Sequence, residues 1–120
     1  MASRRDEDLT ERSFKFSCDA YDYCDELVRL GGLAPRVAFQ LFDAAGSVGA
    51  NRTEAKSAYS RRDFRSKNSI SLKEVREANF WLRLADAKKL GNETLRKRLL
   101  DESNQLVSIY VTAVRNLGDQ

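Results

Sequence analysis

The fold is decided by residues 47–84, which read SVGANRTEAKSAYSRRDFRSKNSISLKEVREANFWLRL. This stretch holds the end of one amphipathic helix, a corner rich in arginine, and a second helix with apolar residues on almost every side. Apolar residues recur in it at steps of three and four, the spacing of a helix face. No segment of the chain alternates apolar and polar residues over a useful length, so the sequence predicts an all-α protein.

The first helix is predicted from about residue 10 or 13 to residue 30, after a flexible charged tail at residues 1–9. Gly31 and Gly32 end it, because glycine adopts the left-handed conformation of a helix C-terminus without penalty. Its apolar face is predicted from the side chains that recur at helical spacing: Phe14, Tyr21, Cys24, Leu27 and Val28.

Two cysteines, Cys18 and Cys24, lie six residues apart and therefore on different faces of this helix. A disulfide between them would distort the helix, and the sequence offers no secretory context. Both are therefore predicted to be small hydrophobic side chains that are buried or half-buried.

The second helix is predicted at about residues 35–59 and has a very regular apolar seam. Pro35 suits its first turn, where a missing N–H leaves no hydrogen bond unmade. The seam alternates steps of four and three, the spacing of packed helices in a bundle: Val37, Leu41, Ala44, Val48, Asn51, Ala55 and Ala58. On this seam Asn51 is expected to specify register by hydrogen bonding, as buried polar seam residues do.

The third and fourth helices are predicted at about residues 61–90 and 92–118. Ser60 is the expected N-cap of the third helix and Asn92 that of the fourth. The loop that joins them at Gly91 is short, so they are expected to be antiparallel neighbours. The seam of the fourth helix is predicted as Leu95, Leu99, Leu106, Ile109, Ala113 and Leu117.

These helices predict a single domain at residues 10–120, folded as an up-down-up-down antiparallel four-helix bundle. The third helix carries apolar residues on two sides, with Val75 and Leu82 on the side opposite to Phe80. A helix that is apolar all round is buried all round, and no helix of a four-helix bundle is central. The second side is therefore expected to contact another subunit through these candidate interface residues: Phe39, Phe80, Trp81 and Leu84.

Charge is segregated along the chain, although the net charge is only +3. Residues 52–67 hold six bases and two acids, whereas residues 1–26 hold four bases and eight acids. The six bases, which we call the basic corner, are candidate contacts to nucleic-acid phosphates: Arg52, Lys56, Arg61, Arg62, Arg65 and Lys67. Two interpretations stay open, namely binding of a polyanion and neutralisation by the acidic N-terminal segment at the same end of the bundle.

Two further features bear on nucleic-acid binding. Tyr59 lies beside the basic corner and is available to stack on a base. A second, weaker basic patch is predicted at the other end of the bundle: Lys88, Lys89, Arg96, Lys97 and Arg98. Nothing resembles a module that reads base edges, so recognition of phosphate and shape is expected.

The sequence does not indicate catalytic chemistry. It has no histidine, which removes the usual general base and the Glu-x-x-His ligand pairs of di-iron bundles. No nucleophile–base pair, metal cluster or glycine-rich phosphate loop is present, so we expect no enzyme activity, no cofactor and no metal. The carboxylates of the central stretch are instead expected to form structural ion pairs, within or between subunits: Glu54, Glu74 and Glu77.

No targeting or membrane segment is indicated. The N-terminus is charged and no apolar segment follows it, unlike a secretory signal. No apolar run approaches the roughly 20 residues that span a bilayer. A cytosolic protein is therefore expected.

The central stretch resembles the bacterial four-helix-bundle family of 23S rRNA intervening-sequence proteins. The resemblance rests on fixed spacings within residues 47–84, while the first twelve residues of the chain lie outside it. The matching positions are Ser47, Gly49, Asn51, Glu54, Ala55, Ser60, Asp63, Phe64, Lys67, Ile70, Leu72, Lys73, Glu74, Glu77, Trp81, Leu82 and Leu84.

The resemblance implies a closed bundle and, in known relatives, a ring of five subunits. Some relatives are encoded inside insertions of large-subunit rRNA genes, and many have no assigned activity. A related bundle is the accessory subunit of diversity-generating retroelements, where it binds a reverse transcriptase and nucleic acid. Because family membership does not settle function, two hypotheses follow. One is a non-enzymatic homo-oligomer that binds RNA or DNA through its basic corners; the other is a scaffold or adaptor for a partner such as a reverse transcriptase.

Overall fold

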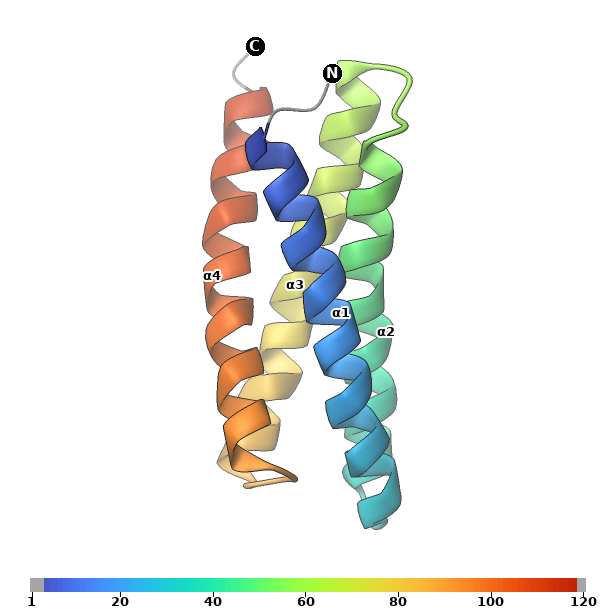
Figure 1. The fold of residues 1–120 in the computed structure, drawn as a ribbon, viewed down its shortest axis with the longest axis vertical. Helices are drawn as coiled ribbons and strands as arrows, with labels where there is room; N and C mark the ends of the chain where they lie inside the picture. Colours follow the sequence, from blue (N-terminus) through green and yellow to red (C-terminus); the bar gives the residue numbers. More distant parts are fainter. Residues whose placement is uncertain (1–3, 119–120) are drawn as a thin grey trace.

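The computed structural model describes residues 4–118, with side chains from residue 8 to residue 116, and that range contains four helices and no strand. The helices are α1 (Arg4–Leu30), α2 (Ala34–Ala55), α3 (Arg61–Ala87) and α4 (Glu93–Gly118). Each helix is antiparallel to the next, and contacts join α1 to α2, α2 to α3, α3 to α4 and α1 to α4 (Figure 1). The predicted all-α four-helix bundle is confirmed. Between residues 4 and 118, none of the helices has the length and apolar character needed to cross a membrane.

Local signals set the ends of the helices. Gly31 and Gly32 take φ angles of 74° and 62° after α1, in the left-handed region that favours glycine. The Oγ atom of Ser60 accepts a hydrogen bond from the backbone N–H of Asp63 at 3.0 Å and caps α3. The Oδ1 atom of Asn92 accepts from the N–H of Leu95 at 2.8 Å and caps α4. Both predicted N-caps are confirmed.

Three predicted boundaries are wrong, and the smallest error is at α3, which ends at Ala87 rather than near residue 90. α1 begins at Arg4, inside the segment predicted as a tail, and Leu9 in this part of the helix is buried; residues 1–3 of that tail lie outside the described range. α2 ends at Ala55 rather than near residue 59, because its last turn tightens. The N–H of Ser57 donates to the carbonyl of Glu54 at 3.0 Å, a shorter loop than an α-helix makes.

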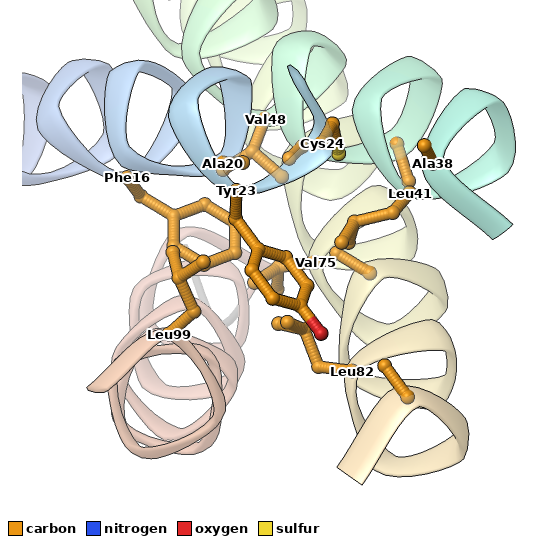
Figure 2. Close-up of a cluster of buried hydrophobic side chains, with 14 of the residues drawn as sticks. Phe16, Ala20, Tyr23, Cys24, Ala38, Leu41, Val48, Val75, Leu82 and Leu99 are labelled. Carbon is orange, nitrogen blue, oxygen red and sulfur yellow. The ribbon is translucent and has the colours of Figure 1, made fainter. Parts of the chain in front are cut away.

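The core lies between the four helices and is built from apolar side chains of all of them (Figure 2). Phe16 and Tyr23 of α1 point from their helix toward Leu99 of α4 and Leu82 of α3. All four are at most 1% exposed. Each such side chain contributes about 1.5–3 kcal/mol through removal of its apolar surface from water. The seam predicted for α2 is buried at Val37, Leu41, Ala44, Val48 and Ala55.

The predicted apolar face of α1 is wrong for its largest residues. Phe14 and Tyr21 are 58% and 60% exposed, and Val28 is exposed as well. The buried face follows steps of four and three along another line of the helix: Leu9, Ser13, Phe16, Ala20, Tyr23 and Leu27. Ser13 is tolerated there because its Oγ atom lies 2.6 Å from the hydroxyl oxygen of Tyr110, within hydrogen-bond distance.

The two cysteines of α1 have different environments. Cys24 lies on the buried face, and burial raises the pKa of its thiol to about 12. Cys18 is exposed, so the prediction that it is buried or half-buried is wrong. Both are free thiols, in agreement with the expectation that they form no disulfide.

Candidate nucleic-acid interface

The corner between α2 and α3 displays most of the predicted phosphate contacts. α2 ends before Lys56 and α3 begins at Arg61, so the bases lie on the connection and on the first two turns of α3. Four of them are exposed and the last is half-buried: Lys56, Arg61, Arg62, Arg65 and Lys67. Among the side chains of residues 8–116, none of these five forms an ion pair. Their charges therefore face solvent.

The basic corner lies at the end of the bundle where α1 begins and α4 ends (Figure 1). The side chain of Tyr59, in the connection between α2 and α3, is fully exposed at 101%. The acidic N-terminal segment was predicted to neutralise the corner, and six of its eight acids have described side chains, none of which forms an ion pair with the five exposed or half-buried bases of the corner. The side chains of the other two, Asp6 and Glu7, lie outside the described range. That interpretation stays a prediction.

Arg52 does not belong to this surface, although the sequence predicted it there. Its side chain is 1% exposed. Its Nε atom donates to Oγ1 of Thr10 at 3.0 Å, and its Nη1 atom donates to Oδ1 of Asn68 at 2.7 Å. The guanidinium carbon lies 5.5 Å from the centre of the Phe64 ring, a cation–π distance. The seam of α2 passes through Arg52 rather than through Asn51, and the guanidinium therefore lies in the bundle interior.

Sequence reasoning does not predict the polar layer that surrounds Arg52. The Oγ atom of Ser71 donates to the carbonyl of Val48 at 2.9 Å, and Nδ2 of Asn68 donates to the carbonyl of Phe64 at 3.0 Å. The layer joins all four helices: Thr10, Ser13, Arg52, Asn68, Ser71 and Tyr110. Burial raises the pKa of the Tyr110 phenol, so this hydroxyl stays neutral. One signal was available, because Asn68 and Ser71 continue the spacing of the buried residues of α3 toward its N-terminus.

The second basic patch, at the other end of the bundle, is largely neutralised. Arg96 is buried and its Nε atom donates to Oδ1 of Asp86 at 2.8 Å. Lys97 donates from Nζ to Oδ2 of the same carboxylate at 2.9 Å, and Arg98 lies 3.7 Å from Oδ1 of Asp19. The hydrogen bonds from Arg96 and then Lys97 lower the pKa of Asp86. Three of the five bases of this patch are thus already paired with carboxylates.

The residues predicted as structural polar groups lie on α2 and α3. Nδ2 of Asn51 donates to the carbonyl of Ser47 at 2.9 Å, so this hydrogen bond stays within α2 and does not set register between helices. Glu54 and Glu77 are exposed, and Glu74 is half-buried. Burial, and next the charge of Glu77, raise the pKa of Glu74.

These carboxylates do not pair as the sequence suggested. Among the side chains of residues 8–116, none of Glu54, Glu74 and Glu77 forms an ion pair within the subunit. Pairing between subunits stays a prediction. The same part of the chain holds no group of three cysteine or acidic side chains placed to bind a metal ion.

The four candidate interface residues lie close together between α2 and α3. Phe39 and Phe80 are 62% and 52% exposed, while Trp81 and Leu84 are half-buried. The rings of Phe80 and Trp81 meet edge to face with 5.0 Å between their centres. Phe39, Trp81 and Leu84 line an open hollow of about 910 Å³. The indole N–H of Trp81 is enclosed and has no acceptor among the described residues.

The comparison with protein families agrees with the arrangement of helices. The family model described as 23S rRNA-intervening sequence protein matches residues 5–111, which include α2, the basic corner and α3. The chain belongs to the 23S rRNA-intervening sequence protein family. No curated protein matches this member of the family.

One solved structure has the same fold as this chain. The structure is of a protein of unknown function from the S23 ribosomal protein family of Bacteroides thetaiotaomicron. It superposes with a TM-score of 0.78 at 24% sequence identity, over 88% of this chain and 97% of that one. At this identity the likeness concerns the fold alone.

Proposed function

We propose that this member of the 23S rRNA-intervening sequence protein family is a non-enzymatic homo-oligomer that binds RNA or DNA through its basic corner. The observation that carries the proposal is a contrast between the two ends of the bundle. The five solvent-facing bases of the basic corner have no carboxylate partner among the described side chains. At the other end, Arg96, Lys97 and Arg98 are paired. An unpaired base gains more from a phosphate, because no existing ion pair has to break.

The proposed interaction is electrostatic. Each base that neutralises a phosphate releases a condensed counterion, so affinity falls steeply as salt concentration rises. The exposed ring of Tyr59 offers a stacking surface that does not distinguish bases. We therefore expect micromolar or tighter binding at low salt with little sequence preference. Repetition of the corner in an oligomer raises the overall affinity through multivalency.

The test reverses the charge of the corner without touching the core. We expect the combined variant R61E, R62E and R65E to lose RNA and DNA binding while it keeps its oligomeric state, because all three side chains are exposed. The matched control K97E and R98E changes the charge at the other end and is expected to weaken binding much less. Gel shift and size exclusion on the same samples give both readouts.

The decisive comparison is at low salt. If the wild-type protein shifts neither RNA nor DNA at about 50 mM salt, where phosphate contacts are strong, the basic corner does not bind a polyanion. The alternative function, a scaffold or adaptor for a partner protein such as a reverse transcriptase, would then be preferred. The exposed aromatic side chains around α2 support that second candidate, since large apolar patches mark interaction surfaces.

A further inference from the structure

The side of the bundle formed by α3 and α4 differs from the two sides that include α2. Among the described side chains, the exposed large hydrophobic ones belong to α1, α2, α3 and the connections between these helices, and α4 has none. The outward surface of α3 beside α4 carries arginines instead. Protein–protein interfaces are depleted of charged residues at their centres, whereas a nucleic-acid backbone is bound by Lys and Arg. The α3–α4 side therefore has the character of a nucleic-acid surface.

Three arginines lie along one line of α3. Arg65 and Arg76 are eleven residues apart, and Arg76 and Arg83 are seven apart, which correspond to about three turns and about two turns. All three side chains are exposed. Within residues 8–116 none of them forms an ion pair. We call these three residues the arginine line.

A contact between helices places the arginine line beside α4. Asn79 lies three residues after Arg76 and four before Arg83, the spacing of neighbours on one helix face. Its Nδ2 atom donates to Oδ1 of Asn104 on α4 at 2.9 Å. Arg115 follows Asn104 by eleven residues, so it lies on the same line of α4. Its side chain is exposed, and among the described side chains it has no ion pair.

The acidic residues of α3 do not neutralise the arginine line. Asp86 already accepts hydrogen bonds from two bases of α4. Asp63 is two residues from Arg65 and therefore points to another side of the helix. Burial, then the charge of Glu77 and also that of Asp43 on α2 raise the pKa of Glu74, so these carboxylates lie on the side of α3 that faces α2. The positive charge of the line is thus available to a ligand.

The exposed acid of α4 that is nearest in sequence to Asn104 also lies away from α3. Asp101 accepts a hydrogen bond from Nε2 of Gln105 at 3.2 Å. The Oε1 atom of the same Gln105 accepts from Nη2 of Arg12 on α1 at 3.3 Å. These contacts place the Asp101 carboxylate toward the α1 side of α4 rather than beside the arginine line.

The basic corner and the arginine line together match the repeat of a duplex. Arg61 and Arg83 are 22 positions apart on one helix, or about 33 Å at a rise of about 1.5 Å per residue. One helical turn of a DNA duplex is about 34–36 Å long. The phosphates of each strand therefore return to the same side of the duplex at nearly the length of this surface. A single strand is flexible and has no such fixed repeat.

The arginine line offers charge rather than rings on which bases stack. Proteins that bind single strands place aromatic side chains along the groove. Phe80 lies between Arg76 and Arg83 in the sequence, but its ring meets that of Trp81 edge to face, with 5.0 Å between their centres. Trp81 lines the hollow beside α2, so these rings lie toward α2. Charged side chains alone suit a duplex, whose bases are already stacked and whose phosphates face outward.

We infer that the nucleic acid bound by this chain is double-stranded, and that its backbone lies along α3 from the basic corner to Arg83. This inference rests on the proposed nucleic-acid binding and names the form of the nucleic acid and its path on the protein. A duplex shorter than one turn contacts the corner alone, whereas a longer one also reaches Arg76 and Arg83. Each phosphate contact adds about 0.9 to the slope of log affinity against log salt for B-DNA.

Neutralisation of the far part of the arginine line tests this path. The variant R76Q and R83Q removes two exposed charges from the line, and the matched control R36Q and K88Q removes two exposed, unpaired charges elsewhere. On a hairpin stem of about 15 bp, or one and a half turns, we expect the salt slope to fall by about 1.8 for R76Q and R83Q and to stay unchanged for the control. On a stem of about 5 bp with the same loop, both variants are expected to bind like the wild type. Circular dichroism checks that both are folded.

The wild-type protein gives a second readout that needs no variant. Stems are prepared in DNA and in RNA, and the tighter binder is compared with an unpaired strand of the same number of nucleotides. We expect the stem of about 15 bp to bind more tightly than that strand. If the strand competes as strongly as the stem, or if R76Q and R83Q keep the wild-type salt slope on the long stem, the path along α3 is wrong while binding at the basic corner stands. If the wild type binds neither stem nor strand at about 50 mM salt, the proposed nucleic-acid binding fails and this inference fails with it.

Discussion

Replacing Arg52 by alanine tests whether this buried guanidinium is a structural group rather than a contact to nucleic acid. The change removes two hydrogen-bond donors, namely Nε, which lies 3.0 Å from Oγ1 of Thr10, and Nη1, which lies 2.7 Å from Oδ1 of Asn68. It also leaves a cavity, because the side chain is only 1% exposed. Hydrogen bonds to charged groups contribute about 1.5–3 kcal/mol each. Each buried acceptor left without its donor costs about 1–3 kcal/mol, so the two acceptors together cost about 2–6 kcal/mol. We expect the free energy of unfolding to fall by roughly the latter amount.

Urea unfolding followed by circular dichroism measures this loss. With a slope of about 2 kcal/mol per molar urea, the unfolding midpoint falls by about 2 M. The double variant R52M and N68L replaces Arg52 and one of its two hydrogen-bond partners by apolar side chains. It is expected to recover part of the stability, because buried polar pairs can be replaced by well-packed apolar residues. The matched control Arg61→Ala, exposed at the basic corner, is expected to change stability by no more than about 0.5 kcal/mol.

The same samples show whether Arg52 contacts a polyanion. At temperatures where Arg52→Ala is folded, its RNA affinity and the dependence of that affinity on salt are expected to equal those of the wild type. Arg61→Ala is expected to reduce the salt dependence, because one phosphate contact is lost. Unchanged unfolding of Arg52→Ala together with a weaker salt dependence would refute the structural assignment.

Two further substitutions test the core and its electrostatics. Leu82→Ala, at a side chain that is 0% exposed, is expected to cost about 2–5 kcal/mol in urea unfolding, whereas the exposed Ile70→Ala changes stability little; equal effects would contradict the assigned core. Burial raises the pKa of Glu74. Its contribution to the free energy of unfolding is therefore most favourable below the ordinary pKa of 4.5, where the carboxyl is protonated, and is lost as pH rises through the raised pKa. Glu74→Gln is therefore expected to raise the Tm at pH 7 and to leave it unchanged at low pH. The exposed control Glu54→Gln is not expected to raise the Tm at pH 7. A lower Tm of Glu74→Gln at pH 7 would show that a partner stabilises the carboxylate.

Much of this fold follows from short-range signals in the sequence. Ser60 and Asn92 cap helices with their own side chains, and Gly31 and Gly32 end one through backbone conformation, so neither signal needs the rest of the protein. The seam of α2 is predicted correctly over most of its length, because small apolar residues repeat along one face of that helix and no second face shows the same repeat. The end of α2 near Ala55 is less predictable, because its last turn tightens through hydrogen bonds between residues three apart and Ala58 continues the seam spacing beyond the helix.

The errors arise where two helical faces compete. Phe14 and Tyr21 repeat with the period of a packed seam, and so does the line that contains Ser13 and Ala20. Both lines carry aromatic side chains, because Phe16 and Tyr23 lie on the buried line with Ser13 and Ala20, so side-chain size does not decide between them. The choice depends on how α2 and α4 pack against α1. Arg52 was misplaced for the same reason. A charged seam residue is buried only where neighbouring helices supply acceptors, and sequence periodicity does not show those acceptors.

Arg52 connects the polar interior to the exposed corner. Its backbone belongs to the last turn of α2, while its guanidinium donates to Asn68 and lies over Phe64, both near the start of α3. This contact ties the end of one helix to the beginning of the next, and the connection between them carries bases of the corner. A corner held in this way would lose less conformational freedom on binding a polyanion than a mobile loop would. The buried arginine thus helps to fix the two helix ends on which the other five bases of the corner lie.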